Sequence, residues 1–85
     1  MSLLDMPNVG PVLAGNLNAV GIQTPEQLSE LGCKDAFVRI RETVDPGACL
    51  HMLYALHGAI EGIPDGRLSD AAKEDLRRFY HNLQV

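Results

Sequence analysis

The sequence predicts an all-α protein, built as a small orthogonal bundle of five or six helices. Apolar residues recur at helical spacing in several segments, and proline, glycine and capping residues separate those segments. No segment shows the alternation that a strand requires. A length of 85 residues, with 46% hydrophobic and 21% charged residues, fits one globular domain over residues 1–85 with a modest core.

The N-terminal segment predicts a helix-hairpin-helix over about residues 3–21. Pro7 cannot continue a helix, and Gly10 allows the backbone to turn tightly. Pro11 has the backbone angle that suits the first turn of a new helix. A second helix is therefore expected over about residues 10–20.

A short helix is expected next, because its start and end are both marked. Thr24 is an N-cap residue, Pro25 occupies the first helical position, and Gln27 stands three residues after the cap. Gly32 ends this helix.

The following helix is expected to begin near Lys34 or Asp35 and to be amphipathic. Its buried face is predicted to consist of Ala36, Phe37, Ile40 and Val44. The side chains predicted to face water are Arg39, Arg41 and Glu42.

A central helix is expected over about residues 47–62, with Asp45 as its cap and Pro46 in its first turn. It is apolar on nearly every face, which is typical of a helix buried in the middle of a bundle. Cys49 is expected in the core as a free thiol. The one polar stripe expected to face solvent consists of His51, Tyr54, Gly58 and Glu61.

The last helix is expected to follow Ser69, which can cap it. Glu74 and Arg78 are four residues apart and can form an ion pair on its surface. Its apolar positions are Ala72, Leu76, Phe79 and Leu83.

Catalysis, metal binding and cofactor binding have no support in the sequence. His51 and His57 are six residues apart, whereas metal ligands on one helix favour three or four. His57 and Glu61 are four apart, but a surface pair is the simpler interpretation. No glycine-rich phosphate loop is present, and Cys33 and Cys49 do not form a CxxC pair. We therefore expect no enzyme activity, no metal and no cofactor.

Charge argues against DNA binding through the hairpin. Backbone N–H groups at Asn8, Val9, Gly10 and Val12 could contact phosphate. Residues 1–33, however, contain no lysine or arginine, and the chain carries a formal charge of −4. Affinity for duplex DNA comes largely from neutralising phosphates, so a structural turn is the preferred interpretation. The basic residues elsewhere are interspersed with acidic ones, which is typical of a solvated face.

The whole chain resembles the C-terminal domain of the TfoX/Sxy family of bacterial competence regulators. The segments that carry this resemblance are residues 7–11, 20–22, 24–28, 31–32, 37–41 and 53–60. The block Leu53-Tyr54-Ala55-Leu56-His57-Gly58-Ala59-Ile60 is the most specific of them, because many families share the hairpin. The resemblance implies a SAM-like or helix-hairpin-helix-like bundle.

The resemblance also implies a role in regulating the transcription of DNA-uptake genes. We expect a non-enzymatic module that acts through a protein partner. We expect it in the cytoplasm, since no apolar run is long enough to span a membrane. A homodimer and DNA binding through the hairpin amides stay open as alternatives. The residues predicted to contact a partner or nucleic acid are Asn8, Val9, Gly10, Val12, Tyr54, Gly58 and Glu61.

Overall fold

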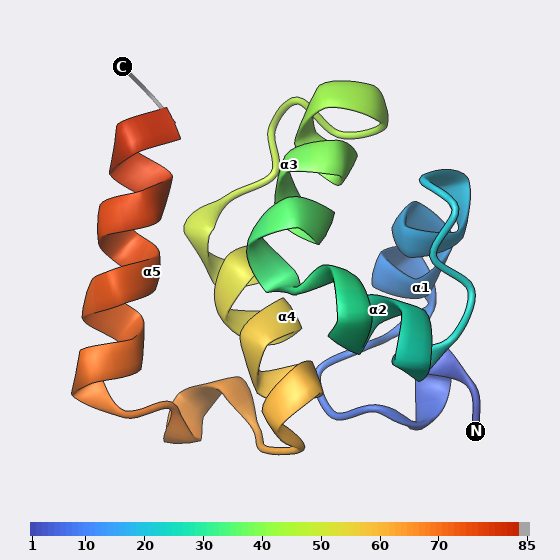
Figure 1. Cartoon of the computed structure of the whole chain (residues 1–85), viewed down its shortest axis with the longest axis horizontal. Helices are drawn as coiled ribbons and strands as arrows, with labels where there is room; N and C mark the ends of the chain where they lie inside the picture. Colours follow the sequence, from blue (N-terminus) through green and yellow to red (C-terminus); the bar gives the residue numbers. More distant parts are fainter. Residues whose placement is uncertain (84–85) are drawn as a thin grey trace.

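A computed structural model describes residues 1–83, and within them every regular element is helical. Figure 1 shows α3 and α4 in the middle, with α1 and α2 on one side and α5 on the other. The elements in chain order are the 3-10 turn η1 (Leu3–Asp5), α1 (Pro11–Ala19), α2 (Pro25–Leu31), α3 (Cys33–Thr43), α4 (Leu50–Glu61), the 3-10 turn η2 (Asp65–Arg67) and α5 (Asp70–Leu83). The predicted all-α class and helix number are confirmed.

The expected hairpin motif is reproduced only in part. Its first helix is the single turn η1, three residues long, so two full helices do not flank the turn. The chain then turns through Asn8, whose φ of 69° lies in the left-handed region. Pro11 starts α1 as predicted.

The capping predictions for α2 and α5 are confirmed. The Gln27 N–H donates to Thr24 Oγ1 at 3.1 Å, and the Gln27 side-chain oxygen accepts from the Gln23 N–H. Gly32, at a φ of 91°, ends α2. In α5 the Ala72 N–H donates to Ser69 Oγ at 3.1 Å. These bonds satisfy N–H groups that a helix start leaves without partners.

The core lies where α3 and α4 pack together and the other helices cover them. Its largest fully buried side chains are Leu17, Leu28, Phe37, Ile40, Leu53, Leu56 and Leu76. Every helix from α1 to α5 contributes at least one of them, which explains why the chain's apolar positions recur at helical spacing.

The start of α4 was predicted too early. Asp45 does not cap it: its side chain accepts the Gly47 N–H at 3.0 Å, and its carbonyl accepts the Ala48 N–H. This local turn competes with helix formation and delays α4 to Leu50. Cys49 therefore stands at the N-cap and is exposed, whereas we expected it in the core.

Three further expectations about exposure were wrong. Val44, the C-cap residue of α3, was expected on the buried face but is 38% exposed. Arg41 was expected in water but is half-buried. Gly58 was expected to face solvent but is buried.

Candidate functional site

Three of the predicted contact residues, Asn8, Gly10 and Val12, lie along a groove between α1 and α4. Its volume is about 420 Å³, and most of its surface is apolar. We call it the α1–α4 groove; it is lined by Asn8, Gly10, Pro11, Val12, Leu13, Asn16, Cys49, His51, Met52, Ala55 and Asp65. Val12 is 79% exposed at the edge of this groove.

The Asn8 side chain is used to hold the fold together. Its Nδ2 donates to the carbonyl oxygens of Ile63 at 3.0 Å and Ala55 at 3.4 Å, and its Oδ1 accepts the Asp65 N–H at 3.0 Å. We call these three bonds the Asn8 bridge. It ties the N-terminal turn to the end of α4 and to η2, so both ends of the amide are satisfied internally.

Gly58 is the position on α4 that makes room for the Asn8 bridge. A Cβ added there would lie 2.6 Å from Asn8 Nδ2 and 2.7 Å from the Ile63 carbonyl oxygen. Both separations are far below van der Waals contact, so only glycine fits. Gly58 is therefore a packing position beneath the turn and is not part of an exposed stripe.

The remaining predicted contact residues do not converge on the groove. Val9 is buried, and its N–H donates to the Met6 carbonyl at 3.4 Å. Tyr54 is half-buried and packs against the core. Glu61 is exposed at the end of α4, 3.5 Å from His57, as the spacing of that pair predicted. Of the seven predicted residues, the structure brings Asn8, Gly10 and Val12 together at one surface.

The groove contains little charge. Its ionisable side chains are those of Cys49, His51 and Asp65, and the His51 Nε2 lies 3.4 Å from an Asp65 carboxylate oxygen. No lysine or arginine lines it. Sequence reasoning missed Met52 and Ala55 here, although Ala55 lies four residues after His51 and three after Met52, spacings that place neighbouring side chains on one side of a helix.

A second cluster joins α3 to α4. Cys33 Sγ lies 3.7 Å from His57 Nδ1, and the other ring nitrogen of His57 faces Glu61. Burial raises the pKa of the Cys33 thiol above its usual 9.0, although the neighbouring Lys34 opposes this shift. The thiol is therefore neutral near pH 7 and is a poor nucleophile. Sequence reasoning did not find this contact because 24 residues separate the two partners.

Neither a metal centre nor a membrane span is indicated by the part of the chain that the structure describes. No group of three or more histidine, cysteine, aspartate or glutamate side chains is placed to hold a metal ion. Among the helices between residues 1 and 83, none is long and apolar enough to cross a bilayer.

Two solved structures have nearly the same fold as this chain. A crystal structure of an uncharacterized protein from Listeria monocytogenes, in a triclinic form, superposes with a TM-score of 0.96 at 42% identity. The match covers 99% of this chain and 94% of that one. A protein of unknown function from Listeria monocytogenes, in a tetragonal form, gives a TM-score of 0.92 at 43% identity, over 95% of this chain and 98% of that one.

Family models agree with the resemblance seen in the sequence. No curated protein shows significant similarity to the chain. The model of the TfoX C-terminal domain, however, matches residues 1–80. The chain therefore belongs to the TfoX C-terminal domain family.

Proposed function

We propose that this domain is a non-enzymatic module that regulates the transcription of DNA-uptake genes through a protein partner, which docks in the α1–α4 groove. The observation that carries the proposal is Val12, an exposed apolar side chain at the edge of an apolar groove. Contiguous apolar surface rimmed by polar residues marks interaction sites, and here the exposed Val12 continues the apolar lining of the groove. Membership of the TfoX C-terminal domain family supports the regulatory role.

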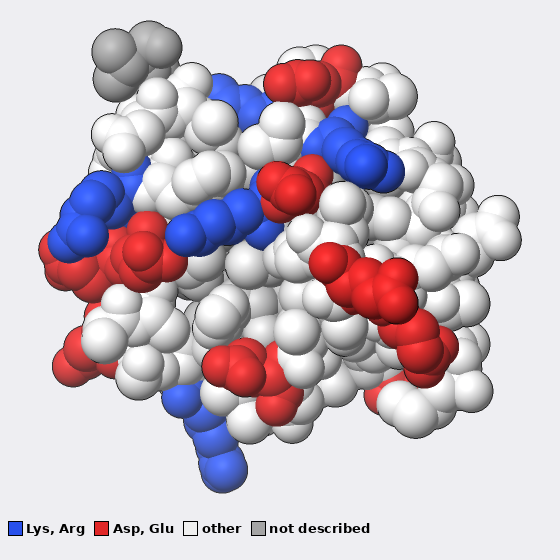
Figure 2. Space-filling view, viewed as in Figure 1, with Lys and Arg blue, Asp and Glu red and all other residues white. Residues whose placement is uncertain are grey.

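Charge favours a protein partner over DNA. Lysine and arginine are absent from residues 1–33 and from the groove. Figure 2 shows, on the face in view, basic and acidic residues side by side over α3 and α5, and acidic residues over α2. A DNA-binding surface needs cations to replace the counterions of the phosphates. The Asn8 bridge also explains the turn without any ligand.

The same charge pattern suggests the character of the partner. The groove offers apolar walls and the carboxylate of Asp65. Residues 1–33, which supply one side of the groove, also carry Asp5, Glu26 and Glu30 and no basic residue, although none of these three acids lines the groove. A partner segment with an apolar anchor and flanking lysine or arginine matches both properties.

A photo-crosslinking residue at position 12 tests this proposal in cells of the host. Position 18 is the matched control, because Asn18 is exposed on the same helix but does not line the groove. We expect a protein adduct from position 12 that position 18 does not give, and a crosslinked peptide that combines apolar and basic residues. Val12→Asp should then lower the transcription of uptake genes, whereas Asn18→Asp should not.

Three outcomes would contradict the proposal. A nucleic-acid adduct at position 12, or tight duplex binding that weakens steeply with salt, would favour the DNA-binding alternative. Crosslinking between two copies of the chain, with a dimer in light scattering, would make the groove a homodimer interface. Equal adducts at positions 12 and 18 would show that the groove has no special role.

A further inference from the structure

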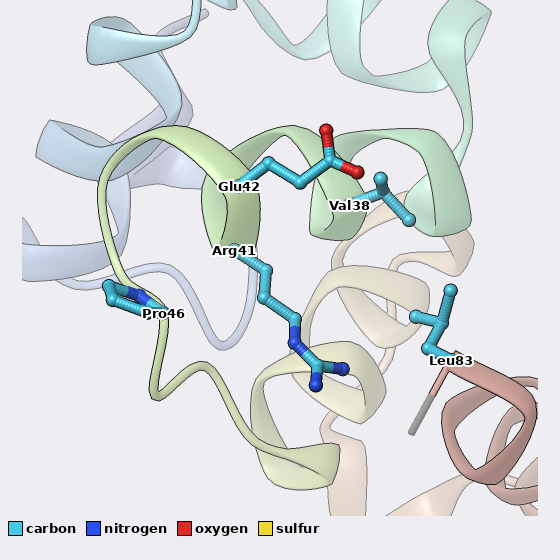
Figure 3. A pocket seen from close by; sticks show the side chains of 5 residues that line it. All are labelled: Val38, Arg41, Glu42, Pro46 and Leu83. Atoms are coloured by element: carbon cyan, nitrogen blue, oxygen red, sulfur yellow. The ribbon is translucent and has the colours of Figure 1, made fainter. Parts of the chain in front are cut away.

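A separate hollow lies at the C-terminal end of α3. Its volume is about 290 Å³, and it is lined by Val38, Arg41, Glu42, Pro46 and Leu83 (Figure 3). We call it the Arg41 hollow. It shares no lining residue with the α1–α4 groove. Three of its five side chains are apolar, so it combines a hydrophobic wall with two charged groups.

The guanidinium of Arg41 lacks an acceptor. Its Nη1 is buried and has no hydrogen-bond partner among residues 1–83. The ion pairs and side-chain hydrogen bonds found between residues 1 and 83 include none to Nε or Nη2, and the arginine as a whole is only half-buried and lines the hollow. The guanidinium carbon lies 5.7 Å from the centre of the Tyr80 ring, whose face attracts the cation but offers no lone pair.

The acid in the same hollow does not neutralise this cation. Glu42 follows Arg41 directly on α3, so the two side chains leave the helix in different directions. Figure 3 shows the Glu42 carboxylate extending away from the guanidinium. Arg41 is therefore a half-buried cation with open donors beside an apolar wall, and an arginine in this state is complementary to a planar carboxylate.

We propose that the Arg41 hollow binds a carboxylate that carries an apolar group beside it, as at the C-terminus of a peptide that ends in an apolar residue. The carboxylate accepts from the accessible donors of Arg41, and the apolar group packs against Val38, Pro46 and Leu83. The apolar wall is the reason for preferring such a ligand over inorganic phosphate, which has nothing to place there.

NMR titration of the full chain tests the site, with the Arg41 Nε–H signal and the α3 amides as the readout. The probes are N-acetyl-leucine, its neutral amide, acetate and inorganic phosphate. We expect saturable shifts with N-acetyl-leucine in the millimolar range, at least about fivefold weaker binding of acetate and phosphate, and no binding of the amide. Equal or tighter binding of phosphate, or no saturation with N-acetyl-leucine, would overturn the proposal.

Variants assign the binding to Arg41. Arg41→Met should weaken N-acetyl-leucine binding by at least about tenfold. The control Arg39→Met removes an exposed arginine of the same helix that does not line the hollow, and should leave binding unchanged. Equal effects of the two variants would overturn the assignment.

Two milder variants keep the test valid if Arg41→Met fails to fold. Arg41→Lys keeps the charge but loses the planar donor pair, and should weaken binding by about fivefold. Glu42→Gln removes a negative charge that lines the hollow and repels a bound carboxylate, and should strengthen binding about twofold. Unchanged binding in both variants would contradict a carboxylate site at Arg41.

Discussion

Two regions around α4 are held together by different kinds of contact. Where the N-terminal turn meets α4, neutral hydrogen bonds from Asn8 satisfy every group of its amide, and Gly58 leaves just enough space for them. Where α3 meets α5, the contacts are charged and partly exposed: Lys34 pairs with Asp75 at 2.9 Å, and Arg41 lies over Tyr80. The first region depends on atomic fit, whereas the second should respond to salt and pH.

The comparison also separates structural polar groups from candidate binding groups. Asn8 and Arg41 are both half-buried polar residues. Asn8 has partners for its donor and its acceptor, so the fold accounts for it completely. Arg41 keeps a buried N–H without a partner among residues 1–83, and the contacts of this part of the chain do not account for it. Such unsatisfied groups are where ligands are most usefully sought.

Gly58→Ala should have the largest effect, because its methyl group collides with the Asn8 amide and with a backbone oxygen. We expect a loss of about 3 kcal/mol in the free energy of unfolding, measured by urea denaturation. Gly15→Ala is the matched control: Gly15 also lies inside a helix, and nothing stands within 4 Å of its added Cβ. That variant should gain about 0.5–1 kcal/mol. Similar changes in the free energy of unfolding for Gly58→Ala and Gly15→Ala would show that the turn at Asn8 can move to make room for the added methyl group.

Asn8→Asp should have the second largest effect. The aspartate keeps an acceptor for the Asp65 N–H but turns an oxygen toward the Ile63 and Ala55 carbonyls, where the amide donated. We expect a loss of about 2 kcal/mol by urea denaturation. Asn8→Gly suits the positive φ and introduces no repulsion, so it should be the milder change. A larger loss in the free energy of unfolding for Asn8→Gly than for Asn8→Asp would contradict the geometry of the Asn8 bridge.

The same contrast explains what the sequence could and could not predict. Local signals predicted the helices well: Thr24, Pro25 and Gly32 mark α2, and Ser69 caps α5. The errors came from competition and distance. Asp45 could equally cap a helix or close a turn, and only the folded chain decides between them.

The packing role of Gly58 could not be predicted, because the side chain that requires a glycine there, Asn8, is 50 residues away in the sequence. On a helical wheel it belongs to the polar stripe of α4, yet the side chain that needs its space belongs to Asn8. The Arg41 hollow was missed for a similar reason, since Pro46 and Leu83 reach it from separate segments. Val12, in contrast, was found because its neighbours in the groove include the turn residues beside it in sequence.

Arg41→Met should change the free energy of unfolding by less than the Gly58 and Asn8 variants do, and should raise it. The methionine keeps the packing of the aliphatic part of the arginine side chain. It removes the buried Nη1 donor, which among residues 1–83 has no partner; leaving such a donor unsatisfied destabilises the folded wild type by about 1–3 kcal/mol. The lost interaction with Tyr80 offsets part of this gain. We expect a net gain of about 1 kcal/mol by urea denaturation, against a change within about 0.5 kcal/mol for Arg39→Met. A clear loss would mean that Arg41 is already satisfied in solution.

The ion pair between Lys34 and Asp75 should give the smallest effect, visible in titration more than in stability. A hydrogen bond from the Lys34 ammonium, together with its charge, holds the pKa of Asp75 below its usual 3.8. Because the folded pKa is the lower one, the pair stabilises the fold above pH 3.8 and this contribution is lost as pH falls through the folded pKa. Lys34→Met should raise the Asp75 pKa toward 3.8 in a carboxyl NMR titration.

Lys73→Met is the control for this titration, because Lys73 lies on the same helix as Asp75 but is not among the groups that shift its pKa. It should leave the Asp75 titration nearly unchanged, and high salt should reduce the difference between wild type and Lys34→Met. A salt-independent shift would mean that the α3–α5 contact is shielded from solvent. In that case it would resemble the Asn8 region, and the contrast between the two regions would be lost.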